Sequence, residues 1–72
     1  MWNEKMHFVE QRLMKYIPAK LRPYVVWLDF EQSSHTYFLV FEKDGKEMEA
    51  EPSDTVAELR WNANQCKEYL GL

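Results

Sequence analysis

Residues 24–51 read YVVWLDFEQSSHTYFLVFEKDGKEMEAE, and this segment carries the clearest strand pattern in the chain. Its hydrophobic residues recur with a period of two and are largely β-branched or aromatic, which is typical of β-strands. The polar run Gln32-Ser33-Ser34-His35 interrupts the pattern once, and Lys43-Asp44-Gly45-Lys46 interrupts it a second time. The segment therefore predicts three consecutive antiparallel strands, the last of which runs from Lys46 to Glu51 and ends at Pro52.

The two predicted turns set the register of the strands. Asp-Gly tolerates the positive φ angles of a two-residue hairpin turn, which places Phe41 opposite Met48. A turn of two or four residues around Ser33-Ser34 places Leu28 opposite Leu39 in the preceding hairpin. One face of the sheet is then apolar along its whole length and consists of Tyr24, Val26, Leu28, Phe30, Tyr37, Leu39, Phe41, Met48 and Ala50.

Amphipathic helices are predicted before and after the three strands. Apolar residues step by three and four along both segments, which places them on one stripe of a helix. The first stripe is Trp2, Met6, Val9, Leu13 and Tyr16, and the second is Val56, Leu59, Ala63, Cys66 and Leu70. We expect helices over residues 4–17 and 54–70, with Thr55 and Glu58 forming a capping box and Gly71 just past the end.

The predicted fold is a single α+β domain over residues 1–72 with the element order α-β-β-β-α. A chain of 72 residues has room for one small core, and its hydrophobic content of 46% is high enough to fill it. Each helix has one apolar stripe, and an antiparallel sheet commonly packs one face on a core. We therefore expect a three-stranded antiparallel meander with two helices packed on one face.

The second face of the predicted sheet has an apolar centre and an acidic margin, and no predicted element remains to cover it. The residues that we assign to a partner-binding site there are Val25, Trp27, Phe38, Val40, Glu42, Glu47 and Glu49. An apolar patch with a polar rim is common in binding sites, and Trp is a favoured anchor. Trp61 joins the assignment because it lies nearly opposite the apolar stripe of its helix, on the solvent side, with folding over the helix end or packing on the N-terminus as the alternative. The alternatives are that a small sheet leaves some apolar residues exposed, or that another turn length exchanges the two faces.

Composition and motifs indicate a protein without catalytic machinery. The single cysteine, Cys66, cannot form an internal disulfide, which fits a reducing cytoplasm. No apolar run approaches the roughly 20 residues that a membrane span requires. A Gly-rich phosphate loop, a Cys-x-x-Cys pair and a His-Glu-x-x-His motif are all absent from the sequence. We therefore expect a cytoplasmic protein that is not an enzyme, has no cofactor or metal, and does not contact a membrane.

Charge is unevenly distributed along the chain, whose net charge is −3. Residues 1–22 carry an excess of lysine and arginine, whereas residues 23–59 carry a large excess of carboxylates. An acidic sheet repels phosphate, so a nucleic acid would have to use the basic first helix, with Lys5, Arg12, Lys15, Lys20 and Arg22. Such an uneven distribution is also found on ordinary solvated surfaces.

The element order and a few residues resemble a double-stranded-RNA-binding domain. The matching residues are Pro23-Tyr24, His35, Gly45 and Ser53. In that family a basic cluster opens the last helix and contacts the phosphates. The corresponding segment here is Ser53-Asp54-Thr55-Val56, which has no lysine, and the Gly-Pro before the turn histidine is missing. The resemblance therefore implies the topology, while the usual RNA-binding residues are absent.

Residues 13–51 are similar in layout to bacterial YezG-like immunity proteins. The shared elements are an amphipathic helix ending in Ile17-Pro18, a strand from Val25 to Phe30, a polar turn, and an aromatic strand from Tyr37 to Phe41. Proteins of that family neutralise a partner toxin, and the longer C-terminal part expected there is missing here. The resemblance implies an inhibitor of this class, and the acidic face fits a toxin that acts on nucleic acid through a basic site.

The sequence thus favours a non-enzymatic protein-protein interaction module of the bacterial or phage inhibitor or immunity type. It would bind a partner with a basic surface through the outer sheet face. A first alternative is a homodimer or larger structural assembly closed by the same face. A second alternative, which the acidic sheet disfavours, is a degenerate nucleic-acid binder that uses the basic first helix.

Overall fold

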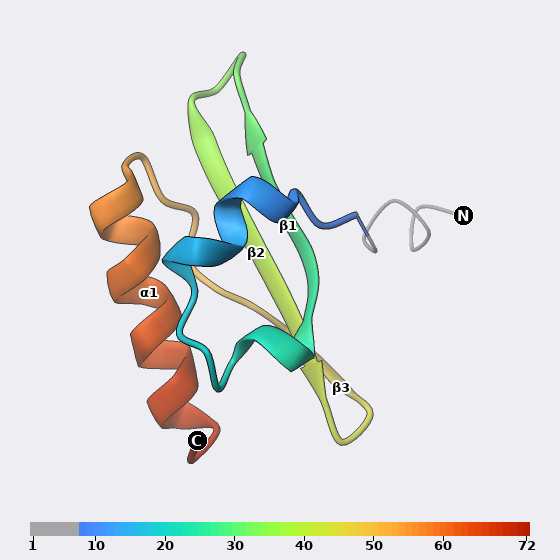
Figure 1. Ribbon diagram of the computed structural model, residues 1–72. Coiled ribbons are helices and arrows are strands. Elements are labelled where there is room, and N and C mark those ends of the chain that lie inside the picture. The colour runs from blue at the N-terminus through green and yellow to red at the C-terminus, as the bar shows by residue number, and fades with distance from the viewer. Residues whose placement is uncertain (1–7) are drawn as a thin grey trace.

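The computed structural model describes residues 8–72, which form a three-stranded antiparallel sheet with helices packed against one of its faces (Figure 1). The elements are the 3-10 helices η2 (Gln11–Tyr16) and η3 (Arg22–Tyr24), the strands β1 (Val25–Glu31), β2 (Thr36–Lys43) and β3 (Lys46–Glu49), and the helix α1 (Val56–Tyr69). The predicted α+β class and the antiparallel meander in the order β1-β2-β3 are confirmed.

The register of both hairpins agrees with the sequence prediction. Leu28 lies opposite Leu39 across β1 and β2, and Phe41 lies opposite Met48 across β2 and β3. The first turn has four residues, and the second is the predicted two-residue turn. Asp44 and Gly45 have φ angles of 56° and 79°, which are the two positive values that a type I′ hairpin turn requires.

A register shift at the start of β1 corrects the predicted assignment of two valines. Val25 lies opposite Phe41 although Trp27 lies opposite Val40, so the strand holds one extra residue between these pairs. Such a β-bulge changes the side of the sheet to which the preceding residues point. Val25 therefore packs against the core, and its placement on the outer face was wrong. Val26, which was predicted for the core face, is not among the residues packed on the core.

The N-terminal segment differs from the expected long helix. Part of that prediction, residues 4–7, lies outside the described residues, but Phe8–Glu10 is extended and runs parallel to β1. The Leu28 N–H donates to the Phe8 carbonyl at 2.9 Å, and the Glu10 N–H donates to the Leu28 carbonyl at 2.7 Å. These bonds satisfy backbone N–H and C=O groups at the open edge of β1. The same edge groups would lose these partners if residues 8–10 formed a helix. Only the 3-10 turns of η2 follow.

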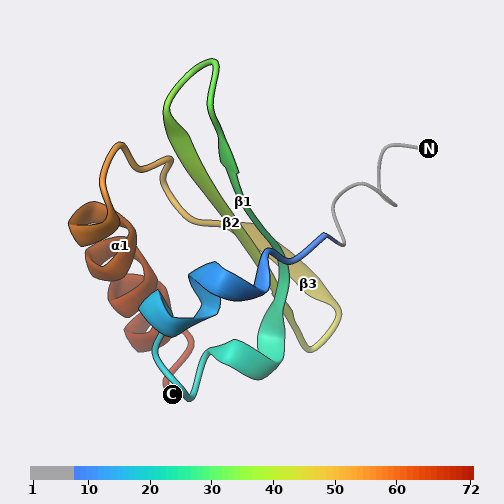
Figure 2. The ribbon, with the colours of Figure 1, turned by 45° about the horizontal axis from the view of Figure 1, so that its top comes forward.

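The core lies between the inner face of the sheet, α1 and the N-terminal turns (Figure 2). Its fully buried members are Ile17, Leu21, Leu28, Leu39, Phe41, Leu59 and Ala63. Ile17 and Leu21 come from the η2–η3 segment, while Leu59 and Ala63 come from α1. Both helical segments therefore cover the same face, as predicted, and no described helix covers the other.

The two ends of α1 have the predicted signals. The Glu58 N–H donates to Thr55 Oγ1 at 3.1 Å, while Glu58 Oε1 accepts from the Asp54 N–H at 2.8 Å. The carboxylate therefore reaches one residue further back than a capping box normally does. Gly71 has a φ of 76°, and the N–H groups of Gly71 and Leu72 donate to the Glu68 and Lys67 carbonyls, which is a Schellman motif.

Ser53 ties the segment before α1 to the sheet. It is completely buried, and its backbone exchanges two hydrogen bonds with Tyr37 of β2, at 2.8 and 3.2 Å. Its Oγ accepts from Asn62 Nδ2 of α1 at 2.9 Å. The same side-chain amide donates to the Glu51 carbonyl at 3.2 Å. One small polar residue therefore links β2, the connecting segment and α1.

Replacing Ser53 by Ala should lower the free energy of unfolding by about 1–2 kcal/mol, because Asn62 loses a buried acceptor at the sheet–helix junction. Urea unfolding followed by tryptophan fluorescence measures the change. The matched control is Ser33→Ala, which removes an exposed hydroxyl in the first turn and should change stability by less than about 0.5 kcal/mol. Equal midpoints for the two variants would contradict the role given to Ser53.

Candidate partner-binding face of the sheet

The outer face of the sheet is the side opposite the core and α1. One row of paired residues crosses it from β1 to β3, with Trp27 opposite Val40 and Val40 opposite Glu49. Phe38 lies two residues before Val40 on the same face, and Glu42 lies two residues after it. An aromatic region and an acidic region are therefore adjacent on one surface.

Trp27 and Phe38 form a stacked aromatic pair at the centre of this face. Their ring centroids are 5.2 Å apart and the ring planes differ by only 5°. The two residues are diagonal neighbours in the β1–β2 register, a separation that large aromatic rings can span. Both side chains are half-buried, so each ring keeps part of its surface open to solvent. Stacking fixes the rings before any partner arrives, which lowers the entropy cost of a contact.

Val40 is not available to a partner, contrary to the sequence prediction. It retains only 1% of its surface, although it lies on the outer face. The physical reason is its small size beside the two large rings, since Val40 pairs with Trp27 and follows Phe38 on the same strand face. A shallow hollow of about 190 Å³ adjoins these side chains, lined by Trp27, Phe38, Leu39, Val40, Glu49, Ala50 and Pro52. Pro52 was not among the residues predicted for this face, and its position after the third predicted strand was its only signal in the sequence.

Three carboxylates border the aromatic pair. Glu42, Glu47 and Glu49 are all exposed, and Glu42 lies directly opposite Glu47. Within residues 8–72 the ion pairs are Arg12 with Glu10 and Lys43 with Asp44, so none of the three is neutralised by a described cation. Like charges directly opposite each other on a sheet are destabilising. The cost is relieved when a cation from another molecule comes between them.

Two other acidic residues near this face accept hydrogen bonds from within the chain. Asp29 Oδ1 accepts from the Phe30 N–H at 2.8 Å, and the Glu31 carboxylate accepts from the hydroxyls of Ser33 and Ser34. These two carboxylates stabilise the edge of β1 and the first turn. The acidic rim of the candidate site is therefore assigned to the β2–β3 carboxylates Glu42, Glu47 and Glu49.

Trp61 does not belong to this surface. It is 63% exposed, which confirms that it points to solvent, but it is carried by α1 on the opposite side of the sheet. The structure brings together Trp27, Phe38, Glu42, Glu47 and Glu49 from the predicted set. It places Val25 on the core, Val40 under neighbouring side chains, and Trp61 elsewhere on the molecule.

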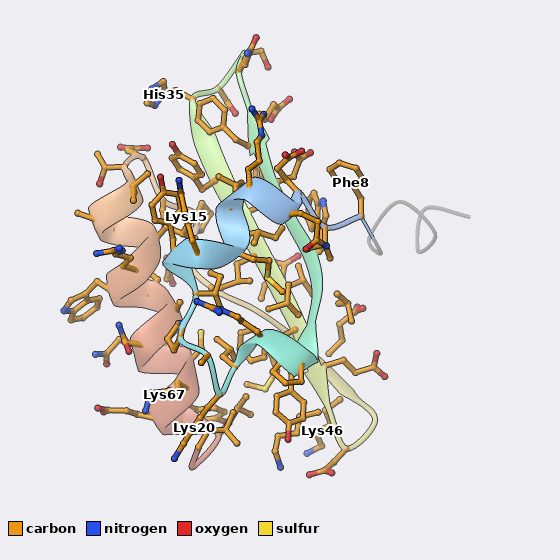
Figure 3. All side chains as sticks on the ribbon, viewed as in Figure 1. Phe8, Lys15, Lys20, His35, Lys46 and Lys67 are labelled. Carbon is orange, nitrogen blue, oxygen red and sulfur yellow. The ribbon has the colours of Figure 1, made fainter. Side chains whose placement is uncertain are left out.

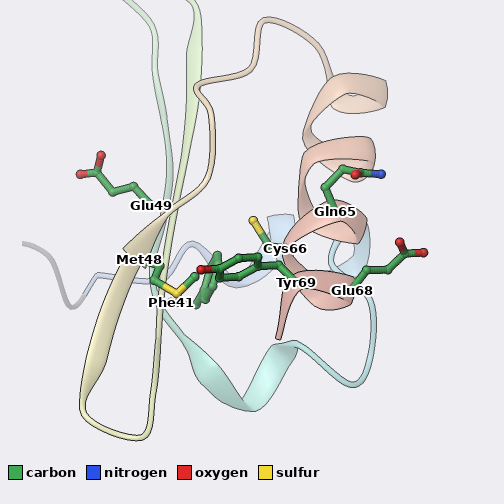
Figure 4. Close-up of a pocket in the computed structure, with 7 residues that line it drawn as sticks. All are labelled: Phe41, Met48, Glu49, Gln65, Cys66, Glu68 and Tyr69. Atoms are coloured by element: carbon green, nitrogen blue, oxygen red, sulfur yellow. The ribbon is translucent and has the colours of Figure 1, made fainter. Parts of the chain in front are cut away.

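A second groove lies between α1 and the edge of the sheet (Figure 4). It has a volume of about 610 Å³ and is lined by Phe41, Met48, Glu49, Gln65, Cys66, Glu68 and Tyr69. Tyr69 extends from α1 toward Met48, whereas Glu49 points away from α1 to the outer face. Cys66 is half-buried here, and burial raises the pKa of its thiol. The groove therefore holds a protonated, weakly nucleophilic cysteine, which fits a packing role.

Between Phe8 and Leu72, no three histidine, cysteine or carboxylate side chains are grouped so that they could hold a metal ion. No helix in this range has the length and apolar character needed to cross a bilayer.

Comparison with known proteins gives no match: no family model, no curated protein and no solved structure shows significant similarity to this chain. The layouts shared with YezG-like immunity proteins and with double-stranded-RNA-binding domains stay predictions from the sequence. The functional assignment therefore depends on the geometry and charge of the outer face.

Native Cys66 should react with iodoacetamide more slowly than the same cysteine in the urea-unfolded chain. The thiolate is the nucleophile, and the raised pKa moves its formation in the folded protein to higher pH. Mass spectrometry of the alkylated chain across a pH series gives the two rate profiles. Superimposable profiles for folded and unfolded chains would show that the thiol is not shielded in the groove.

Proposed function

We propose that this protein is a non-enzymatic binding module whose outer sheet face docks onto a basic surface of another protein. One observation carries the proposal: the stacked Trp27–Phe38 pair lies next to three unneutralised carboxylates, on a face that no described helix covers. A partly exposed aromatic centre beside a charged rim is how many protein–protein interfaces are composed. The acidic rim would also accelerate encounter with a partner of opposite charge.

The hollow beside the aromatic pair suggests which partner side chains fit. Its apolar lining comes from Trp27, Phe38 and Pro52, and Glu49 supplies a carboxylate at its edge. A lysine or arginine has an apolar stem and a charged head, so it would bury the stem against the rings and direct the head to Glu49. This chemistry supports a partner whose contact surface carries basic residues.

An inhibitor or immunity role is the most specific form of this proposal. Proteins that act on nucleic acids present basic sites, and an acidic protein surface can occupy such a site in place of the phosphates. A C2 contact through the same face would instead bring two copies of the same acidic surface into one interface. Repulsion between those acidic surfaces supports a heterologous partner over a homodimer.

The substitution Glu47→Lys should stabilise the fold and weaken partner binding at the same time. It turns the repulsive Glu42–Glu47 pair into an attractive one, which should raise the free energy of unfolding by about 0.2–1 kcal/mol. It also removes a carboxylate from the proposed interface. Chemical denaturation measures the first effect, and surface plasmon resonance with a purified partner, first captured from lysate on wild-type protein, measures the second.

The matched control for this variant is Lys46→Glu. Lys46 lies opposite Lys43 on the inner side of the same hairpin, so the change relieves a similar repulsion away from the outer face. This control should stabilise the fold by a similar amount and keep or increase the affinity. If both variants bound equally well, or if Glu47→Lys bound more tightly, the acidic rim would have no part in the interface.

Truncating Trp27 to Ala should weaken partner binding by at least about 2 kcal/mol, which is roughly a 30-fold higher Kd, because it removes half of the aromatic anchor. Trp61→Ala is the matched control, since it removes an exposed tryptophan from another face. Isothermal titration calorimetry gives both values, with circular dichroism to confirm folding. Loss of affinity in Trp61→Ala alone would move the interface to α1, and loss of a wild-type dimer in Trp27→Ala would assign the outer face to self-association.

A further inference from the structure

A small basic cleft lies between the η2–η3 segment and α1, away from the outer sheet face. Its volume is about 300 Å³, at the lower end of the range for small-molecule sites. The lining residues are Lys15, Tyr16, Ile17, Pro18, Ala19, Arg22, Arg60 and Asn64. Three of them are cations and none is a carboxylate. Figure 3 shows Lys15 on the side of η2 that lies toward α1.

Separate contacts hold the three cations in place. Arg22 Nε donates to the Ile17 carbonyl at 2.9 Å, which fixes the guanidinium and leaves its two terminal nitrogens for other acceptors. The Lys15 Nζ and the Arg60 guanidinium carbon lie 5.3 and 5.5 Å from the centre of the Tyr16 ring. One tyrosine therefore orients a cation from η2 and a cation from α1.

The cations are not neutralised by neighbours that the structure describes. Neither ion pair within residues 8–72 involves Lys15, Arg22 or Arg60. On α1 the residues three and four positions from Arg60 are Val56, Ala57, Ala63 and Asn64, so no carboxylate lies one turn away on the same face of the helix. Gathering like charges costs free energy, and an anion in the cleft would reverse that cost.

We propose that this cleft binds the phosphate group of a small ligand. Two guanidinium groups and one ammonium match the two negative charges and the several acceptor oxygens of a phosphate monoester, and arginine is suited to bidentate phosphate contacts. Asn64 and Tyr16 line the same cleft and add polar groups for the rest of the ligand. The site is independent of the outer-face interface and uses Arg60, which lies far from the other cations in sequence.

The test is titration of ¹⁵N-labelled protein with inorganic phosphate at constant ionic strength, followed by amide chemical shifts, with chloride as the reference anion. Saturable shifts should appear at Tyr16, Ala19 and Asn64. Arg60→Gln should weaken phosphate binding at least about 10-fold, and Lys15→Gln should weaken it several-fold. Arg12→Gln is the matched control, because it removes the same charge from an arginine outside the cleft, and it should change the Kd less than about 2-fold.

Further probes distinguish the source of the phosphate. Adenosine monophosphate should bind at least as tightly as inorganic phosphate, whereas adenosine should not bind. The proposal is overturned if phosphate gives no saturable shifts beyond chloride, or if Arg12→Gln and Arg60→Gln lose affinity equally. It is also overturned if an oligonucleotide without terminal phosphate binds more tightly than adenosine monophosphate and shifts residues around Arg12, since a nucleic-acid surface would then be present instead. Unchanged circular dichroism spectra of the variants exclude unfolding as the cause of any loss.

Discussion

The hydrogen bonds of Ser53 are the constraint on which the arrangement of the two layers depends. Few backbone positions of the sheet and α1 lie close together, and the connecting segment contains Pro52, whose nitrogen has no hydrogen to donate to the β-ladder. By pairing with Tyr37 and accepting from Asn62, Ser53 holds the connection against β2 and orients the start of α1 over the sheet. Leu59 and Ala63 can then reach the core, and the opposite face of the sheet is left to other uses.

This arrangement separates charge on the molecule. The outer face of β2 and β3 carries unneutralised carboxylates, while the cleft beside α1 carries three cations, two of them held against Tyr16 and the third by the Ile17 carbonyl. Sheet and helix layers keep the two groups on different sides, so neither neutralises the other. A single small domain therefore has two surfaces of opposite electrostatic character, each suited to a different class of ligand.

The hairpins could be predicted from sequence because their determinants are local. Asp44-Gly45 selects the turn, and alternation along β1 and β2 then fixes which side chains face each other. The sequence predictions failed where local patterns did not determine the structure on their own. A strict period of two cannot reveal the bulge that turns Val25 toward the core. The apolar spacing of Val9 and Leu13 is compatible with a helix, but it is equally compatible with the observed extended segment, whose backbone bonds to Leu28, followed by a short 3-10 helix. The basic cleft could not be foreseen, since Arg60 joins Lys15 and Arg22 only through the packing of α1.

Both edges of the sheet are poor templates for another strand. β3 has only four residues, of which three are charged, and β1 is partly occupied by Phe8–Glu10, while Asp29 takes the neighbouring Phe30 N–H. Natural proteins use short, charged or covered edges to prevent strand addition and aggregation. The described edges of the sheet therefore offer few free backbone groups for another strand to pair with. Side chains on the outer face can therefore be substituted without altering the hydrogen-bonded frame that presents them.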